Sequence, residues 1–548
     1  MRKFLLCVLW LLFAVPAAGQ TNGVLQIDDG IHRFLVRQHL AGRLPGAHLS
    51  HQPLSAADGQ AYLDSLQIIR RDLSETDRIL LDRFRRVIPG PGVATVKARI
   101  PRVYTNGHDL IGASSEDWSI SVNPLSVGSY GKGKRTAGEG VDTRPTVWQN
   151  TRGLHVAGTV GPWFFFEGRF TENSKRSVKV DFAGGSAPRL GYVQAETNSY
   201  TWMDAVGVVG VRSKYLEARF GRDRYRWGNG LSSPFLSNFA PAYDHVLLKA
   251  RLWRFEYTSL FSAYSSSVPS GSRIRRRKYG SSHRLAVHLP GKLEVSIFET
   301  VVFATDSLEV RERFDLSYAN PVIFLRAVER DRGSPDNVLL GASVAWRPLK
   351  GTRVFVELLM DEFRSDFVGK AWWANKWVWN YGLQVADFPV SGLTVRLEAA
   401  RLRPFIYQHG GEINAYVHFG DILGHPAGAN AWDYTVAVDY QASPRLRFST
   451  QTAITRRGRN ANGINYGSDP LADYYAGRNG DFGHTILQGV RQTQILSESF
   501  VSYEVLPTLF ADLAVRLESL DDAERGLDRW VTPFIQLRWG VPFPSVRW

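Results

Sequence analysis

Three arginines stand at alternate positions in a densely charged stretch of the sequence, at Arg222, Arg224 and Arg226. Trp227 follows directly. On a β-strand, alternate residues share one face, so this spacing predicts three guanidinium groups in a row. A guanidinium is planar and donates paired hydrogen bonds that match a carboxylate. The row could therefore bind an acidic sugar, or it could form a structural network with neighbouring carboxylates such as Asp223.

Two further groups of residues could contact a polymer. Arg275, Arg276 and Arg277 would attract polysaccharide or lipid phosphate as point charges, unless they only form a solvated loop. Trp372 and Trp373 have aromatic faces that can stack on sugar rings. The alternative is that these tryptophans belong to an aromatic girdle at a membrane edge. Together with the arginine row and its tryptophan, these residues are the candidate polysaccharide-binding set.

Residues suited to enzymatic chemistry are not evident. Asp361 and Glu362 are adjacent, so on a strand they point to opposite faces, whereas glycoside hydrolysis needs two carboxyls about 5–10 Å apart across one bond. His409, His418 and His425 match no compact metal-binding spacing. The sequence has no Gly-x-Ser-x-Gly elbow and no phosphate-binding loop. We therefore expect no enzymatic activity, no catalytic residue, no metal and no cofactor.

The elements that must position these residues are predicted to be β-strands. In the segment 509–518, Leu513 and Val515 alternate with Asp512 and Arg516. Such alternation gives a strand one apolar face and one charged face. The strand candidates are 177–183, 206–220, 253–258, 292–298, 352–359, 393–399, 433–440, 445–450, 500–504, 509–518 and 531–539, and the loop candidates include 265–282 and 456–484.

The start of the chain decides between a soluble sandwich and a membrane barrel. Residues 1–19 resemble a secretion signal peptide, because Arg2 and Lys3 precede an apolar core of suitable length. In an outer-membrane barrel, the apolar face of each strand meets lipid and the charged face lines the lumen. We therefore predict a transmembrane β-barrel in the bacterial outer membrane. The length allows roughly 16 to 22 strands of about 10 residues.

The composition agrees with this class. Cys7 is the single cysteine, so the chain without its signal has no disulfide and no cysteine ligand for a metal. Aromatic residues make up 12% of the chain and glycine occurs 50 times, as girdles and turns require. The formal net charge of +14 favours anionic partners. For an exported protein, acidic polysaccharide and lipid phosphate are better candidates than nucleic acid.

The segment after the signal peptide has a different pattern. Ser55 and Ser74 each stand three residues before an aspartate, as helix-capping residues do. Apolar residues then recur at helical spacing. We predict two helices within 55–87 that form a small bundle on one end of the barrel. The expected domains are a signal peptide at 1–19, a helical segment at 20–95 and the barrel at 96–548.

Four motifs in chain order resemble the Wzi-type capsule assembly proteins. They are Arg224–Gly230 (RYRWGNG) with Ala240-Pro241-x-x-Asp244, Tyr318-x-Asn320-Pro321, Asp336-Asn337 with Asp361-Glu362-Phe363, and Leu423–Ala431 (LGHPAGANA), in which Ala427 replaces the family's leucine. The resemblance implies an all-β, antiparallel outer-membrane barrel of about 18 strands. It also implies a helical bundle that plugs the periplasmic end, and a lectin role toward exported capsular polysaccharide.

Residues and resemblance together predict a protein that binds capsular polysaccharide or exopolysaccharide, expected to be acidic, and anchors it to the cell surface. Outer-membrane lipid, lipopolysaccharide and the barrel-insertion machinery are the other expected partners, and nucleic acid is not one. The main alternative is a diffusion channel, or porin, for sugars or other solutes. A membrane enzyme acting on lipid or glycan is a further alternative.

Overall fold

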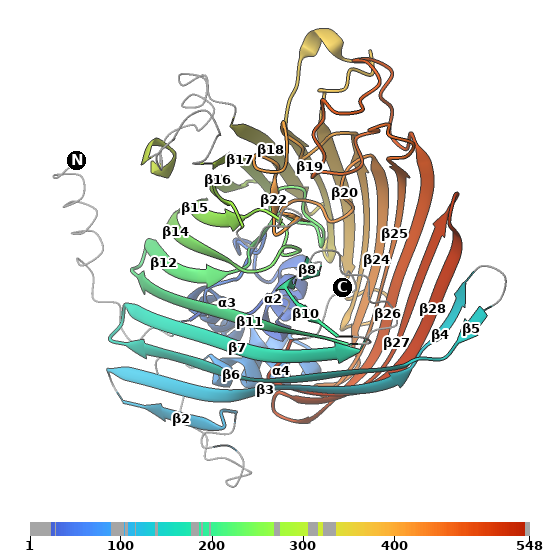
Figure 1. The fold of residues 1–548 in the computed structure, drawn as a ribbon. Helices are drawn as coiled ribbons and strands as arrows, with labels where there is room; N and C mark the ends of the chain where they lie inside the picture. The colour runs from blue at the N-terminus through green and yellow to red at the C-terminus, as the bar shows by residue number, and fades with distance from the viewer. Residues whose placement is uncertain are drawn as a thin grey trace.

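The alternating segments pair into one antiparallel sheet that closes on itself in the computed structural model (Figure 1). The structure describes residues 23–27, 29–88, 104, 108–115, 117–137, 141–176, 186–187, 190–196, 199–267, 275–304, 316–321 and 336–542. The predicted signal peptide and the strand candidate 177–183 lie outside these residues. Strand β28 pairs with β3, from Trp539 opposite Ser126 to Phe534 opposite Gly131, and this pairing closes the barrel.

Among the described residues, the barrel wall has 18 strands, which confirms the predicted fold class. The wall strands are β3 (Trp118–Lys132), β6 (Thr146–Val160), β7 (Phe164–Arg176), β11 (Tyr200–Arg212), β12 (Leu216–Asp223), β14 (Tyr243–Leu252), β15 (Phe255–Ser265), β16 (Arg277–Leu289), β17 (Leu293–Ala304), β18 (Asn337–Trp346), β19 (Thr352–Met360), β20 (Trp377–Ala386), β21 (Leu393–Leu402), β24 (Ala431–Gln441), β25 (Leu446–Arg459), β26 (Val490–Leu506), β27 (Leu509–Asp522) and β28 (Gly526–Trp539).

Shorter strands add to this sheet or form pairs of their own. Strands β2 (Ile111–Ser114), β4 (Lys134–Ala137), β5 (Val141–Thr143) and β10 (Gln194–Ala195) extend the wall sheet. The separate pairs are β1 (His51–Gln52) with β13 (Arg226–Trp227), β8 (Ser186–Ala187) with β9 (Gly191–Tyr192), and β22 (Val417–His418) with β23 (Asp421–Ile422).

Each wall strand turns its apolar face outward, as predicted. Leu513 on β27 is 62% exposed, and Ile535 on β28 is 59% exposed. Their neighbours Asp512 and Arg538 are buried inside, where Arg538 Nη2 donates to Asp512 Oδ1 at 3.1 Å. The exposed apolar side chains therefore form the lipid-facing surface, and the lumen holds paired charges.

The two ends of the barrel differ in their connections. At one end the strands are joined by short turns, such as 213–215, 253–254 and 507–508. At the other end most connections are long, and they include 361–376 and 460–489. In outer-membrane barrels the short turns face the periplasm and the long loops face outward. By this rule, the end with the long loops is the outer end of the barrel.

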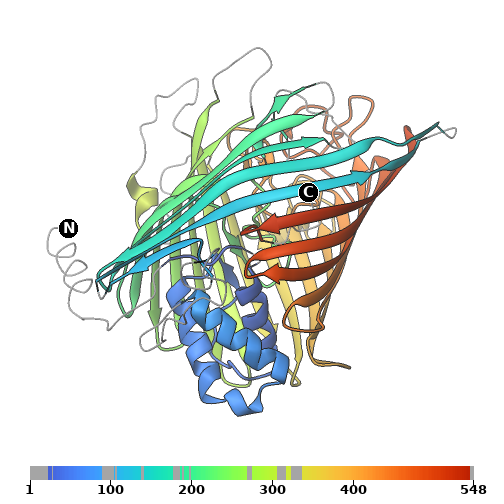
Figure 2. The same cartoon turned by 90° about the horizontal axis from the view of Figure 1, so that it is seen from below.

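The helical bundle lies at the short-turn end of the barrel, where Figure 2 shows it inserted into the opening. Its α-helices are α2 (Gly30–Leu40), α3 (Ala56–Ile68) and α4 (Glu75–Val87), and the described residues also hold the short 3₁₀ helices η1 (Arg70–Asp72), η3 (Leu316–Ala319) and η4 (Ser365–Phe367). Leu35, Leu63 and Leu81 are fully buried between the helices. None of the helices in the described residues has the length and apolar character needed to cross a membrane.

The two predicted helices are present with the predicted caps, and a third was missed. Ser55 accepts a hydrogen bond from the Asp58 N–H at the start of α3, and Ser74 does the same for Asp77 at the start of α4. Helix α2 was missed because its buried positions include polar residues such as Arg37, which hide the apolar period. Arg37 Nη1 donates to Asp387 Oδ1 at 2.9 Å in a short turn of the wall.

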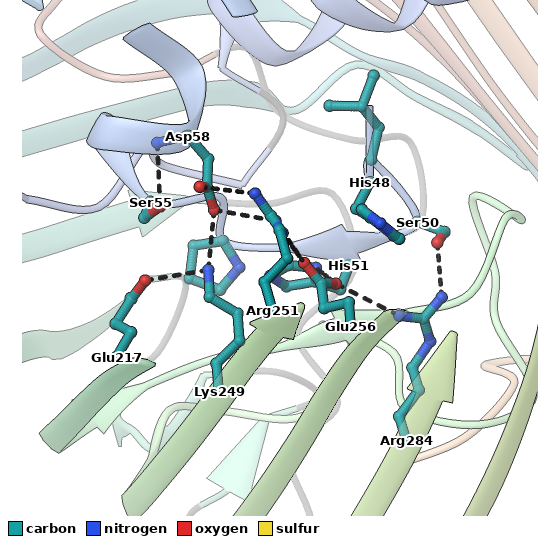
Figure 3. Close-up of polar contacts among 12 residues, drawn as sticks. His48, Ser50, His51, Ser55, Asp58, Glu217, Lys249, Arg251, Glu256 and Arg284 are labelled. Carbon is teal, nitrogen blue, oxygen red and sulfur yellow. Dashed lines mark hydrogen bonds and ion pairs between the residues drawn. The ribbon is translucent and has the colours of Figure 1, made fainter. Parts of the chain in front are cut away.

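A network of buried charges fixes the bundle to the wall (Figure 3). Asp58, in the first turn of α3, pairs with Lys249 at 2.9 Å and with Arg251 at 2.8 Å, both on β14. Glu256 on β15 pairs with Arg251, and its Oε1 lies 2.9 Å from His51 Nδ1. We call these five residues the latch. Because each latch charge has an opposite partner, burial of the group is compensated.

The connection between β12 and β14, residues 224–242, folds into the lumen. The backbone N–H of Asn229 donates to Glu357 Oε1 at 2.5 Å, and that of Leu231 donates to Glu398 Oε1 at 2.8 Å. Gly228 has φ +127°, and a Cβ there would lie 2.7 Å from Glu357 Oε1. The glycine therefore allows the loop to approach the wall carboxylates closely.

Two predictions of local structure are wrong. The segment 206–220 is not one strand, because Ser213 N–H donates to Leu216 O at 2.7 Å and a turn separates β11 from β12. The alternation of apolar and polar residues continues across this turn, so the sequence pattern did not reveal the turn. The loop predicted at 265–282 is too long, because β16 begins at Arg277.

Candidate functional site

Three long connections, residues 361–376, 403–430 and 460–489, form a layer over the outer end of the barrel. Figure 1 shows 361–376 in yellow and 460–489 in orange-red at the top, with β22 of the connection 403–430 below them. Trp373, Phe405 and Tyr474, one from each connection, pack into one cluster of buried side chains. The layer therefore has its own small apolar core, which fixes the positions of the side chains above it.

Aromatic rings extend from this core to the surface. Trp373 is 4.7 Å from Tyr474 between ring centroids, and Trp372 is 4.7 Å from Phe367. The rings of Tyr475 and Phe482, next to these, are exposed to solvent. We define the aromatic ridge as Phe367, Trp372, Trp373, Tyr474, Tyr475 and Phe482, of which Tyr475 is 68% exposed and Phe482 is 52% exposed.

Cations lie directly against the ridge. The guanidinium of Arg478 is 4.0 Å from the centroid of the Trp373 ring, and Arg364 is 5.1 Å from that of Phe367. A cation over an aromatic face is attracted by the ring's quadrupole, so these contacts hold the cations in place. The surface thus presents aromatic faces and positive charge side by side, which is a chemistry that suits sugar rings and acidic groups.

Arg403 holds the loops that carry the ridge. Its Nε donates to Asn375 O at 3.1 Å, and its Nη2 donates to Trp372 O at 2.9 Å. Its Nη1 donates to His484 O at 2.5 Å, in the other loop. One buried guanidinium therefore joins both ridge loops through their backbone carbonyls.

A buried ammonium lies beneath the ridge. Lys376 Nζ is 3.0 Å from Glu362 Oε1 and 3.5 Å from Asp361 Oδ1, and it donates to Gln408 O at 3.0 Å. The two adjacent carboxylates thus turn toward one cation, because they lie beyond the end of β19 and not on opposite faces of a strand.

The same carboxylates and His409 form a group of potential metal ligands. Their ligand atoms lie within 4.8 Å of one another. Burial raises the pKa of Asp361 to about 6. Burial also acts on Glu362, but the nearby His409 and the charge of Lys376 lower its pKa to about 2. The Lys376 ammonium already supplies positive charge at this position, so we assign the group to loop stability.

The predicted arginine row does not form. The chain leaves the sheet after Asp223, so the three arginines diverge. Arg222 lies on the same outward face of the strand as the exposed Phe220, and it pairs with Asp244 at 3.2 Å. Arg224 makes two hydrogen bonds to Asp204, each 3.0 Å long. The prediction of three guanidinium groups in a row on one strand face is therefore wrong.

The last arginine of the row and the tryptophan after it lie inside the barrel. Arg226 is 7% exposed and pairs with Gln52 across the β1–β13 ladder. Trp227 is fully buried and packs edge-on to Phe298 at 6.1 Å between centroids. Neither residue lies on the outer surface with the ridge.

The other candidate residues lie at the outer end but in two separate places. Arg275 stacks on Phe419 at 4.3 Å, and Arg276 and Arg277 are exposed at the start of β16. Trp372 and Trp373 belong to the ridge. They lie in a loop beyond the wall strands, so the girdle alternative does not apply to these two.

Sequence reasoning missed Arg478, Phe405 and Phe482 as neighbours of the two tryptophans. Tyr475 was visible as part of a tyrosine pair in a glycine-rich loop, but its partners were not. These residues are 30 to 110 positions from Trp373 in the chain. Only the pairing of the strands brings their loops together, and no local spacing encodes that.

Comparison with known proteins gives a consistent result. A family model, Capsule assembly protein Wzi, matches residues 158–519. The solved structure of Wzi, described as an outer-membrane carbohydrate-binding β-barrel of group 1 capsule assembly in Escherichia coli, has 13% identity and a TM-score of 0.56, and the match covers 95% of this chain and 100% of that one.

Other solved structures match with lower scores. Pseudomonas aeruginosa OccK5 (OpdH) matches with 10% identity and a TM-score of 0.40, over 76% of this chain and 97% of that one. P. aeruginosa OccK2 (OpdF), solved with glucuronate, has the same score and identity, over 78% and 98%. No match was found among curated proteins. Because the family model matches well over half of the sequence, the chain belongs to the Wzi family of capsule assembly proteins, which are barrels of the outer membrane.

Proposed function

We propose that this protein binds exported polysaccharide through its aromatic ridge and so holds the polymer at the cell surface. Membership of the Wzi family supports a role in capsule assembly. The observation that carries the site is the exposure of Tyr475 and Phe482 beside Arg478, at the end with the long loops.

The physical basis is stacking combined with charge. The apolar faces of sugar rings pack on aromatic rings, and Tyr475 and Phe482 offer such faces. Arg364 is exposed and close enough to meet a carboxylate on the same sugar, whereas Arg478 is already paired with Asp481 at 2.7 Å. Acidic polymer is therefore the favoured partner, and Arg275, Arg276 and Arg277 form a second basic region at the same end.

Weak single contacts suffice for retention because the polymer repeats. Each sugar unit offers the same groups, so a released unit is replaced by the next at high effective concentration. Retention then depends on the number of contacts rather than on one tight site. This mode needs no catalytic group, and we propose that the protein acts without catalysis.

Other features complete the proposal. Residues 1–19 would direct export, residues 20–95 would contain the periplasmic bundle, and residues 96–548 would form the barrel. Outer-membrane lipid and lipopolysaccharide would surround the exposed apolar wall, and the insertion machinery would act on the strands during assembly. The inward loop 224–242 and the bundle both occupy the lumen, which favours binding over diffusion.

The test uses a deletion strain complemented with variants. High-molecular-weight polysaccharide is measured on cells and in the medium. We expect total polymer to be unchanged in the deletion strain but to shift from cells to medium. Tyr475→Ala/Phe482→Ala should reproduce the shift, and the matched control Phe388→Ala, an exposed ring in a short turn, should not. An unchanged distribution with reduced uptake of a small solute would favour the channel instead.

A further inference from the structure

A cavity lies inside the barrel, at the opposite end from the ridge. It has a volume of about 370 Å³ and lies between helices α2 and α4 and the inner faces of β24 to β28. Its lining reaches the short turns at Pro444 and Thr508. Sites for small ligands typically start at about 300 Å³, so the space fits one or two sugar units. We call it the lumen cavity.

One group in the lining lacks a partner. Glu498 on β26 is 1% exposed, and its Oε2 accepts from Arg516 Nε at 2.8 Å. Its other oxygen, Oε1, is buried without a hydrogen-bond donor. A buried carboxylate oxygen without a donor is energetically unfavourable. A ligand with hydroxyl groups would supply the missing donor.

Aromatic rings lie on both sides of the space. Phe500 is two residues from Glu498 on the same inner face of the wall. Across the cavity, Phe34 of α2 and Phe84 of α4 contact each other at 5.4 Å between centroids. Rings on two walls and a carboxylate at the edge form an arrangement that suits a flat, hydroxyl-rich molecule with C–H faces.

Among the described residues, five of the eight arginines in the lining are paired with carboxylates. Arg447 Nε donates to Asp439 at 2.6 Å, and Arg538 is paired with Asp512. Arg83 is paired with Glu504. Since these guanidinium groups already face carboxylates, they offer little net positive charge to a ligand. Neutral sugars can exchange hydrogen bonds with arginine–carboxylate pairs, so they suit this cavity better than a polyanion does.

We propose that the lumen cavity binds a short neutral saccharide, with Glu498 Oε1 accepting from a sugar hydroxyl and the phenylalanine rings packing on its C–H faces. This goes beyond the proposed function, because the cavity and the ridge lie at opposite ends of the barrel. Either site can exist without the other.

The test is a binding titration on the full-length folded barrel in lauryldimethylamine oxide, a detergent without sugar. The probes are glucose, galactose, mannose, N-acetylglucosamine, maltose and cellobiose, each followed by saturation-transfer NMR. We expect saturable binding of at least one probe. Glu498→Gln should weaken it by about tenfold or more, because a hydrogen bond to a charged acceptor is lost.

A second test does not depend on the charge of Glu498. It compares a variant that fills the cavity with a control on the other face of the same strand. Gln451, opposite Glu498 on β25, lines the cavity, whereas the next residue, Thr452, lies on the other face of the strand. Gln451→Trp should abolish binding and Thr452→Trp should leave it unchanged, with folding checked by heat-dependent gel migration.

Two results would overturn the proposal. Absence of saturable binding with every probe would mean that the cavity holds only water. Binding that survives Gln451→Trp but is lost in Tyr475→Ala/Phe482→Ala would place the sugar at the ridge, and the proposed function would then stand without the lumen site.

Discussion

Lys376 shows how a single residue can support the outer surface without touching its ligand. The side chain is fully buried, and its ammonium is shared by Asp361 and Glu362. The ring of Trp373 lies 5.7 Å from it. Loss of the charge would leave two carboxylates uncompensated beneath the ridge.

Lys376→Met should therefore destabilise the loop layer by about 3–5 kcal/mol, the usual cost of breaking a buried pair. The measurement is thermal unfolding of the purified barrel, followed by near-ultraviolet circular dichroism of the ridge aromatics. Lys370→Met, which removes an exposed ammonium from the same loop, is the control and should change little. Equal effects of the two changes would refute the structural role of the buried ammonium.

Trp227 and Tyr475 are both aromatic, but they should respond oppositely to truncation. Trp227→Ala opens a cavity in a core of fully buried residues, so we expect a loss of about 3–5 kcal/mol in stability. Tyr475→Ala removes an exposed ring and should cost less than about 0.5 kcal/mol. Denaturant titration of both variants checks this. Polymer retention per folded molecule should fall only for Tyr475→Ala.

At the scale of elements, the latch determines how firmly α3 sits in the barrel. Asp58→Asn would leave Lys249, Arg251 and Arg212 facing an uncharged amide. We expect this to cost about 3–5 kcal/mol and to speed hydrogen exchange in residues 56–68. Asp64→Asn on the same helix is the matched control, because Asp64 is about half exposed. If exchange were the same in both variants, the latch would have no role in holding the helix.

Acidification should loosen the bundle. Burial lowers the pKa of His39 to about 3 and that of His48 to about 4. Both folded pKa values lie below the ordinary value of 6.5. Between pH 6.5 and these folded values, the unfolded bundle therefore binds more protons than the folded one. The stability of the folded bundle falls as pH decreases through this range.

The pH effect is measured as hydrogen exchange of α2 and α3 at pH 7 and at pH 5, corrected for intrinsic rates. Exchange should be faster at pH 5. The double variant His39→Gln/His48→Gln should show a smaller difference between the two pH values. A wild-type bundle with equal protection at both values would contradict the assignment of these histidines as neutral.

At the scale of the whole molecule, charge at the outer end should make retention sensitive to salt. Raising the ionic strength from about 0.15 M to 1 M shortens the screening length from about 8 to 3 Å. Arg364 is exposed at this surface, so its attraction for an acidic polymer should weaken. The measurement is polymer released from cells washed in each salt. No change in release would indicate that stacking alone holds the polymer.

The barrel could be predicted from the sequence because alternation is a local property. Leu513 and Asp512 show their opposite faces without reference to any other strand. The caps at Ser55 and Ser74 are equally local, and both were confirmed. Family motifs then supplied the strand number, which alternation alone left between about 16 and 22.

The site was less predictable because it depends on contacts between distant segments. The row at Arg222, Arg224 and Arg226 has the right spacing for one strand face, but the strand ends inside it. Trp373 was among the candidates, yet its neighbour Arg478 follows more than 100 residues later. The role of the candidate residues in polymer binding stays a prediction, as do the domain boundaries.

Arg403 has a consequence for how such a surface can diversify. It holds the two ridge loops through the backbone carbonyls of Trp372, Asn375 and His484, and every residue type offers the same carbonyl. The side chains of the loops can therefore be exchanged while the clamp and the barrel below it stay intact. A library that varies only the exposed ridge positions would then yield folded barrels with altered sugar preference, so one scaffold can follow a changing polymer.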